Sequence, residues 1–80
     1  MMKLTLYYRS GCSLCEDMER ELRQCGVVDA ASLRCIDIDR DVSLRQRYDH
    51  KVPVLTGCDD EEICHYFLDL KALQNYFATH

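Results

Sequence analysis

The spacing of apolar and polar residues changes along the chain, and each change predicts an element. Residues 3–8 alternate and are rich in aromatic and β-branched types, which predicts a strand. From Ser13 the apolar positions fall three or four apart, so we expect an amphipathic helix that ends at Gly26. Its expected apolar stripe and supporting ion pairs are Leu14, Met18, Leu22 and Cys25, with Glu16–Arg20 and Glu19–Arg23.

The rest of the chain predicts a strand over 33–39. The unit that starts at Lys3 and ends with this strand has the roughly 30 residues that a βαβ crossover requires, so the two strands should be parallel. Asp39 or Asp41 can cap a short helix that runs to about Tyr48. Antiparallel strands are expected over 54–56 and 62–67, and Asp69 should cap a final helix. The helix positions expected to pack are Val42, Leu44 and Tyr48, and then Leu70, Ala72, Leu73, Tyr76 and Phe77.

This order, βαβ-α-ββα, predicts an α/β fold with a four-stranded mixed sheet flanked by helices. The 80 residues leave room for one domain, so we expect a single domain over 1–80, and a monomer. A net charge of -4 argues against nucleic acid as a partner. No apolar run approaches the roughly 18 residues of a membrane span, and none resembles an export signal. We therefore expect a cytoplasmic protein without a membrane partner.

The chain has six cysteines, which a reducing compartment would keep as thiols. Cys12 and Cys15 form a Cys-x-x-Cys motif between the first strand and the first helix, where open α/β sheets place reactive groups. At the helix N-cap, Cys12 would receive backbone N–H groups that stabilise a thiolate, whereas Cys15 would be more shielded. Arg9 would add positive charge nearby, while Glu16 and Asp17 would oppose a thiolate.

This pattern predicts that Cys12 attacks a disulfide and that Cys15 resolves the mixed disulfide. The main alternative is a structural zinc site, because Cys-x-x-Cys is common in zinc proteins. The nearest further ligands are Cys58 with Cys64 or His65, and their spacing matches no usual finger pattern. Redox use is therefore the favoured interpretation, and no bound cofactor or metal is expected.

The segment 6–15, Leu-Tyr-Tyr-Arg-Ser-Gly-Cys-Ser-Leu-Cys, resembles the active-site segment of glutaredoxins, and Val52-Pro53 resembles their Val-Pro before the third strand. The resemblance covers nearly the whole chain and implies a thioredoxin fold. It also implies that Pro53 is cis and faces Cys12, which leaves the Val52 backbone free to pair with an extended peptide or with glutathione.

The resemblance further implies where glutathione, the expected co-substrate, would bind. A cation near the Val-Pro turn would hold its glycine carboxylate, and Lys51 stands there in a basic cluster with Arg45, Arg47 and His50. A solvated helix face is the alternative for this cluster. Asp69 loosely matches the residue at the γ-glutamyl end, although Asp before an apolar periodic run is the usual signature of a helix cap. The candidate substrate-binding or glutathione-binding residues are Arg9, Lys51, Val52, Pro53 and Asp69.

Besides the loose match at Asp69, the sequence departs from glutaredoxins at two places. Ser13-Leu14 replaces the Pro-aromatic pair usual between their cysteines, and Cys64-His65 stands where they have Gly-Gly. Among the other thiols, Cys25 and Cys35 are expected to pack as small apolar residues, and Cys58 to be exposed. Cys64 should either pack or pair with Cys58 across the hairpin, and His65 should lie on a strand face.

Together these features predict an electron-transferring thiol-disulfide oxidoreductase with a redox-active disulfide between Cys12 and Cys15. Its expected substrate is a disulfide-containing protein or a glutathione mixed disulfide, and its reductant glutathione or a thioredoxin-type reductase. Two alternatives remain open. One is a metal-binding module, with zinc or with an iron-sulfur cluster shared between two chains through Cys12. The other is a peptide-binding module without turnover.

Overall fold

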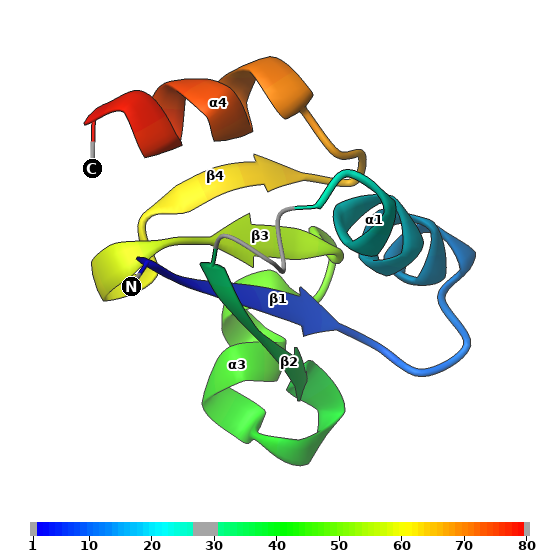
Figure 1. The fold of residues 1–80 in the computed structure, drawn as a ribbon. Coiled ribbons are helices and arrows are strands. Elements are labelled where there is room, and N and C mark those ends of the chain that lie inside the picture. The colour runs from blue at the N-terminus through cyan, green and yellow to red at the C-terminus, as the bar shows by residue number, and fades with distance from the viewer. Residues whose placement is uncertain (1, 27–30, 80) are drawn as a thin grey trace.

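The computed structural model describes residues 2–26 and 31–79, which form a sheet with strand order β2-β1-β3-β4. β1 is parallel to β2 and antiparallel to β3, and β3 is antiparallel to β4, as predicted. Helices α1 and α4 lie on one face and α3 on the other (Figure 1). The elements are β1 (Met2–Tyr8), α1 (Ser13–Gln24), β2 (Ala31–Asp37), α3 (Val42–Tyr48), β3 (Val54–Thr56), β4 (Glu62–His65) and α4 (Leu70–Thr79), with 3-10 turns at Ile38–Arg40 and Cys58–Asp60.

The alternation in β1 builds two cores, one on each face of the sheet. Leu4 and Leu6 are buried towards α1 and α4, where they join Met18, Leu22, Leu55, Cys64, Leu73 and Tyr76. Tyr7 points to the opposite face, where it packs with Ile38, Tyr48 and Val54. The rings of Tyr7 and Tyr48 stack with centroids 4.6 Å apart. Because both faces of β1 are covered, the central strand is held firmly in register.

Tyr7 also links its core to the turn between β3 and β4. Its hydroxyl donates a hydrogen bond of 2.7 Å to Asp60 Oδ1. Burial, followed by this bond, raises the pKa of Tyr7 to about 12. The hydroxyl therefore stays protonated and remains a donor across the physiological pH range.

Helix α1 starts and ends close to the predicted limits. Cys12 is its N-cap, Cys25 is its C-cap, and Gly26 follows with a φ of +80°, a conformation that glycine adopts readily. The predicted pair of Arg23 with Glu19 is present at 2.9 Å. Arg20, in contrast, pairs with Asp17 at 2.8 Å and not with Glu16.

The second strand was predicted too far along the chain. It ends at Asp37, whose carboxylate accepts a hydrogen bond from the backbone N–H of Asp39 and starts a 3-10 turn. The turn directs Ile38 into the α3-side core, where it is fully buried. Asp41 then caps α3 through its contacts with the N–H groups of Ser43 and Leu44, which confirms one of the two predicted caps.

Two helix positions expected to pack are exposed. Val42, the first residue of α3, is 63% exposed, whereas Leu44 is half-buried and Tyr48 is buried. Leu70 is 49% exposed at the start of α4, while Leu73 and Tyr76 enter the core. Helical periodicity identified the buried face but not how far the sheet extends beneath each helix.

The last strand is two residues shorter than predicted. It ends at His65, and Tyr66 follows with a φ of +64°. The N–H of Phe67 donates to the carbonyl of His65 at 2.7 Å, so the chain makes a tight turn at Tyr66. This turn leaves Phe67 69% exposed.

The predictions for the outlying cysteines were partly wrong. Cys25 and Cys35 are exposed rather than packed, because Cys25 caps a helix end and Cys35 lies on the edge strand β2. Cys58 is exposed, as predicted. Cys64 is buried in the core as a free thiol, so packing, and not a bond to Cys58, accounts for it.

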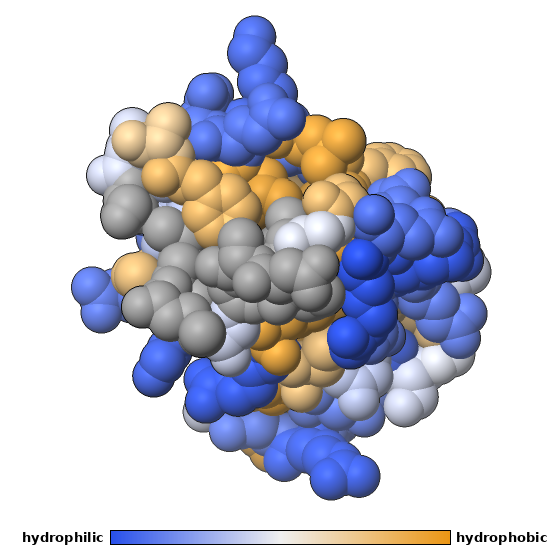
Figure 2. All heavy atoms as spheres, in the orientation of Figure 1, coloured by the Kyte–Doolittle hydropathy of each residue, from blue (hydrophilic) through white to orange (hydrophobic). Residues whose placement is uncertain are grey.

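Apolar surface gathers where the segment from β4 to α4 passes close to α1. Tyr66, Phe67 and Leu70 are among the exposed large apolar side chains, and Figure 2 shows orange surface between α4 and α1. None of the helices in the described ranges is long and apolar enough to cross a membrane.

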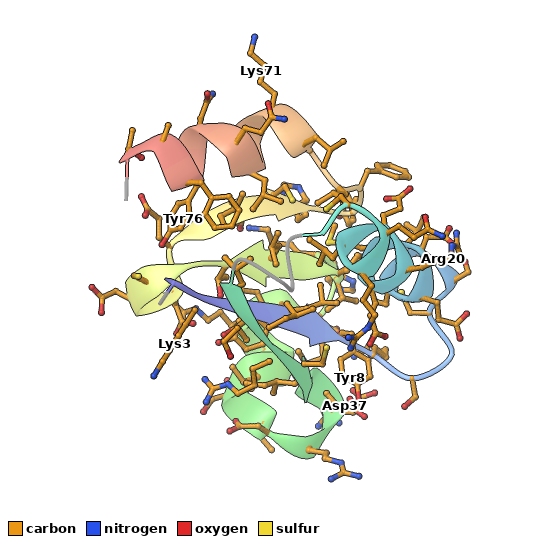
Figure 3. The ribbon with its side chains drawn as sticks, viewed as in Figure 1. Lys3, Tyr8, Arg20, Asp37, Lys71 and Tyr76 are labelled. Atoms are coloured by element: carbon orange, nitrogen blue, oxygen red, sulfur yellow. The ribbon has the colours of Figure 1, made fainter. Side chains whose placement is uncertain are left out.

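Gly57 gives a test of the packing beneath α4. A Cβ added at Gly57 would lie 2.1 Å from the ring of Tyr76, whose hydroxyl accepts a hydrogen bond from the N–H of Cys58. Figure 3 shows Tyr76 below α4, on its sheet side. We expect Gly57→Ala to lower the free energy of unfolding by about 1–3 kcal/mol, as overpacking does. Urea denaturation measures this change.

Gln46→Ala, on the exposed side of α3, is the control and should change stability by no more than about 0.5 kcal/mol. If Gly57→Ala unfolded at the same urea concentration as the parent, the ring of Tyr76 would not be fixed as described.

Candidate functional site

The predicted site residues come from segments that meet at one end of the sheet. Tyr8, the last residue of β1, lies opposite Asp37 of β2, and both are labelled at this end in Figure 3. Tyr7 lies opposite Val54 of the antiparallel strand β3, so Pro53 enters the sheet beside the exit of β1. The chain leaves β1 through Arg9 and Ser10 and turns at Gly11, whose φ is +75°, before it reaches Cys12.

Cys12 occupies the N-cap of α1 with extended backbone angles. Its Sγ accepts a hydrogen bond of 3.1 Å from the backbone N–H of Cys15, and its carbonyl accepts one from the N–H of Glu16. The side chain is half-buried and therefore partly open to solvent. One backbone N–H group of the first turn of α1 is therefore directed at this sulfur.

Cys15 lies one turn further along α1 in very different surroundings. It is only 3% exposed. Burial, followed by the interaction with Cys12, raises the pKa of Cys15 to about 12, although a backbone hydrogen bond from Arg9 acts in the opposite direction. Cys15 is therefore a protonated thiol near neutral pH, held beside the partly exposed sulfur of Cys12.

A shallow cavity of about 310 Å³ opens beside Cys15. Its lining is Tyr8, Arg9, Ser10, Gly11, Cys15, Glu16 and Glu19. The Cys15 thiol therefore borders a space that opens at the surface, although its side chain is almost fully buried.

Arg9 does not present a free positive charge. Its guanidinium binds Asp39 at 3.1 Å and also Asp49, which belong to the turn after β2 and to the end of α3. The pKa of Asp49 is lowered, chiefly by its hydrogen bond with Arg9. Arg9 therefore joins three segments around the site, a role that sequence analysis did not find.

Three members of the basic cluster, Arg47, His50 and Lys51, likewise lie beside acids. Lys51 Nζ binds Glu62 Oε1 at 2.6 Å, and this contact is the largest cause of the lowered pKa of Glu62. Arg47 lies 4.0 Å from Asp60, and His50 lies 3.6 Å from Asp49. Both cations proposed for substrate binding, Lys51 and Arg9, are thus already held by carboxylates.

The peptide bond between Val52 and Pro53 is cis, in agreement with the expectation from the resemblance. Pro53 is fully buried, and its carbonyl accepts a hydrogen bond of 2.9 Å from the N–H of Tyr66. Val52 is half-buried against the α3-side core.

Asp69 lies just before α4 and accepts a hydrogen bond of 3.0 Å from the N–H of Ala72, so it acts as a helix cap. Cys64 and His65 both lie within β4, so His65 is a strand residue as expected, and its side chain is exposed. The backbone conformation that usually calls for glycine occurs after them, at Tyr66, and not at the pair aligned with Gly-Gly.

Within residues 2–26 and 31–79, no group of three or more His, Cys, Asp or Glu side chains is arranged to hold a metal ion. The cysteines of the described chain are free thiols in this structure.

A Cys-x-x-Cys motif at the first strand-to-helix junction and this strand order, with helices on both faces of the sheet, define a protein of the thioredoxin fold. Solved structures agree. Protein Ne2328 from Nitrosomonas europaea has a TM-score of 0.82 at 41% identity, over 94% of this chain and 89% of that one. Protein XcR50 from X. campestris has a TM-score of 0.76 at 30% identity, over 96% of this chain and 97% of that one.

Thioredoxin 1 from Thermosipho africanus shares the fold, with a TM-score of 0.66 at 19% identity over 98% of this chain and 97% of that one. A comparison with curated proteins finds no significant match. The sequence profile of the glutaredoxin-like domain family (DUF836) matches residues 3–78. The chain belongs to this family, and its fold and family suggest a function of the redox type.

The sequence analysis missed the carboxylates that hold the two cations, namely Asp39, Asp49 and Glu62. Arg9 and Asp49 are 40 positions apart, so no helical or strand spacing could link them. A chain with 14 acidic and 10 basic residues does imply that cations find partners, but not which ones.

The contrast between the two thiols predicts their order of alkylation. Alkylation requires a thiolate, and Cys15 is buried with a raised pKa. At pH 7.5, iodoacetamide should modify Cys15 at least about tenfold more slowly than Cys12 or the exposed Cys58, since each unit of pKa changes the thiolate fraction about tenfold. Mass spectrometry of peptides follows each site.

The same reaction in concentrated urea is the control, because every thiol should then react at a similar rate. Modification of Cys15 as fast as Cys58 in the folded protein would contradict the described burial.

Proposed function

We propose that the protein is a thiol-disulfide oxidoreductase in which Cys12 attacks and Cys15 resolves. The observation that carries this proposal is the contrast between two neighbouring thiols. Cys12 is partly accessible to solvent and its sulfur accepts a hydrogen bond from a backbone N–H of α1, whereas Cys15 is buried and protonated. A nucleophile and a resolving thiol need these two environments.

The reaction has two exchange steps. The Cys12 thiolate attacks one sulfur of the substrate disulfide, which forms a mixed disulfide and releases the other sulfur as a thiolate that takes up a proton. Cys15 then loses its proton and attacks Cys12 Sγ, which closes the Cys12–Cys15 disulfide and releases the second substrate thiol. Two electrons pass from the protein dithiol to the substrate, and an external thiol reductant, glutathione or a thioredoxin-type reductase, restores the dithiol.

The charges around the site favour a disulfide in a polypeptide over a glutathione mixed disulfide. Lys51 and Arg9, the candidate partners for glutathione carboxylates, are bound to Glu62 and to Asp39 and Asp49. Asp69 is engaged with the backbone of α4. Glutathione would have to displace these contacts, whereas an extended chain needs mainly backbone groups such as those of Val52.

The first test is equilibration of the pure protein across thiol redox buffers, followed by mass spectrometry of trapped thiols. We expect a reversible Cys12–Cys15 disulfide with a midpoint in the range of intracellular oxidoreductases, roughly -180 to -270 mV. Cys58→Ser, which removes an exposed thiol outside the pair, should titrate like the parent. Absence of this disulfide under oxidising buffers would reject the proposal.

The division of labour makes a second prediction. In Cys15→Ala the first exchange can occur but the resolving step cannot, so incubation with a disulfide-bonded protein should accumulate a covalent complex. Non-reducing electrophoresis detects this complex, and Cys12→Ser should form none. If Cys12→Ser trapped as much substrate as Cys15→Ala, the attacking thiol would not be Cys12.

A further inference from the structure

Tyr66 combines an unfavourable backbone conformation with two specific contacts. Its φ of +64° lies in the left-handed region, which bulky residues rarely occupy. Glycine at this position would avoid the steric cost. A side chain that stays at such a position is expected to contribute something that glycine cannot.

Both hydrogen bonds of Tyr66 reach the segment that leads into β3. Its backbone N–H donates to the carbonyl of Pro53 at 2.9 Å, and its hydroxyl donates to the carbonyl of His50. One residue therefore holds both ends of the segment 50–53. A third contact, the ion pair between Lys51 and Glu62, joins the same segment to β4.

Val52 lies between these two anchored carbonyls. Its backbone N–H and C=O form no hydrogen bond with any residue of the described ranges. Unpaired backbone groups next to a sheet can pair with an added extended chain. The direction of the Val52 N–H and C=O depends on the peptide groups before and after them, and Tyr66 holds one carbonyl on each side, those of His50 and Pro53.

The ring of Tyr66 is itself held in place. It packs edge-on against the imidazole of His65, with centroids 4.7 Å apart. His65 Nδ1 lies 2.8 Å from Glu62 Oε2, so the imidazole of His65 and the ammonium group of Lys51 contact the same carboxylate. These contacts with β4 restrain the Tyr66 side chain and so position its hydroxyl.

From these contacts we propose that Tyr66 is a positioning residue for polypeptide substrates: it holds the carbonyls of His50 and Pro53 so that the Val52 backbone is set to pair with the chain carrying the disulfide. This inference rests on the proposed oxidoreductase function. Tyr66 touches neither cysteine in the described contacts, so its effect should fall on binding of the chain and not on sulfur exchange.

The test compares two disulfides that both carry 2-mercaptoethanol as a leaving group. One probe is a flexible peptide whose single cysteine forms a mixed disulfide with 2-mercaptoethanol, and the other is bis(2-hydroxyethyl) disulfide, which has no peptide groups. Excess probe is mixed with fully reduced protein, and formation of the Cys12–Cys15 disulfide is followed over a single turnover, so no external reductant is needed. The dependence on probe concentration separates the half-saturating concentration from the limiting rate.

Tyr66→Phe removes only the hydroxyl. For the peptide probe we expect its half-saturating concentration to rise about three- to tenfold, the equivalent of one hydrogen bond, with the limiting rate unchanged. The rate with bis(2-hydroxyethyl) disulfide should match that of the parent. Tyr76→Phe is the matched control, because its hydroxyl also bonds a backbone group, but at the turn after β3, and both probes should react as with the parent.

The outcomes distinguish this inference from the proposed function. If the parent oxidises with neither probe, the oxidoreductase proposal fails. If the parent reacts with both and Tyr66→Phe changes neither half-saturation value, or slows both probes equally, the positioning role of Tyr66 is rejected. Urea denaturation of each variant confirms that it is folded during the measurement.

Discussion

The burial of β1 on both faces is the constraint on which the rest of the structure depends. Leu4 and Leu6 hold the strand against α1 and α4, and Tyr7 holds it against α3. A slip of one residue would exchange these sets, so the strand has one register. Because β1 ends at Tyr8, that register also fixes where the chain turns and where Cys12 begins α1. The position of the dithiol is thus set by a hydrophobic strand that takes no part in the chemistry.

Around this fixed point the charged side chains act mainly on one another. Arg9 is bound by two carboxylates, and Lys51 is bound by one. Such exposed ion pairs contribute little stability individually. Their effect at the site is to hold loops together and to neutralise cations that would otherwise attract an anionic ligand. The two thiols are consequently differentiated by the backbone of α1 and by burial more than by neighbouring charge.

The sequence predicted the order and direction of the strands, the N-caps of α1 and α3, and the thiols at the junction, because these follow from local periodicity and turn chemistry. It failed where the outcome depends on distant parts of the chain. The end of β2 depends on Ile38 finding a core beneath α3, and the exposure of Cys35 depends on β2 being an edge strand. The sequence did not indicate the turn at Tyr66, because an aromatic residue after Ile63 and His65 is typical of a strand that continues.

The cluster of Arg9, Asp39 and Asp49 also limits how this chain can diverge. Loss of Arg9 alone would leave two carboxylates facing each other beside the site, and like charges at short range repel. Loss of one acid would leave the other to hold the guanidinium. Replacement of Arg9 is therefore expected only where at least one of the two acids has also been replaced, so homologous chains should vary at positions 9, 39 and 49 in a correlated way although these positions are far apart in sequence.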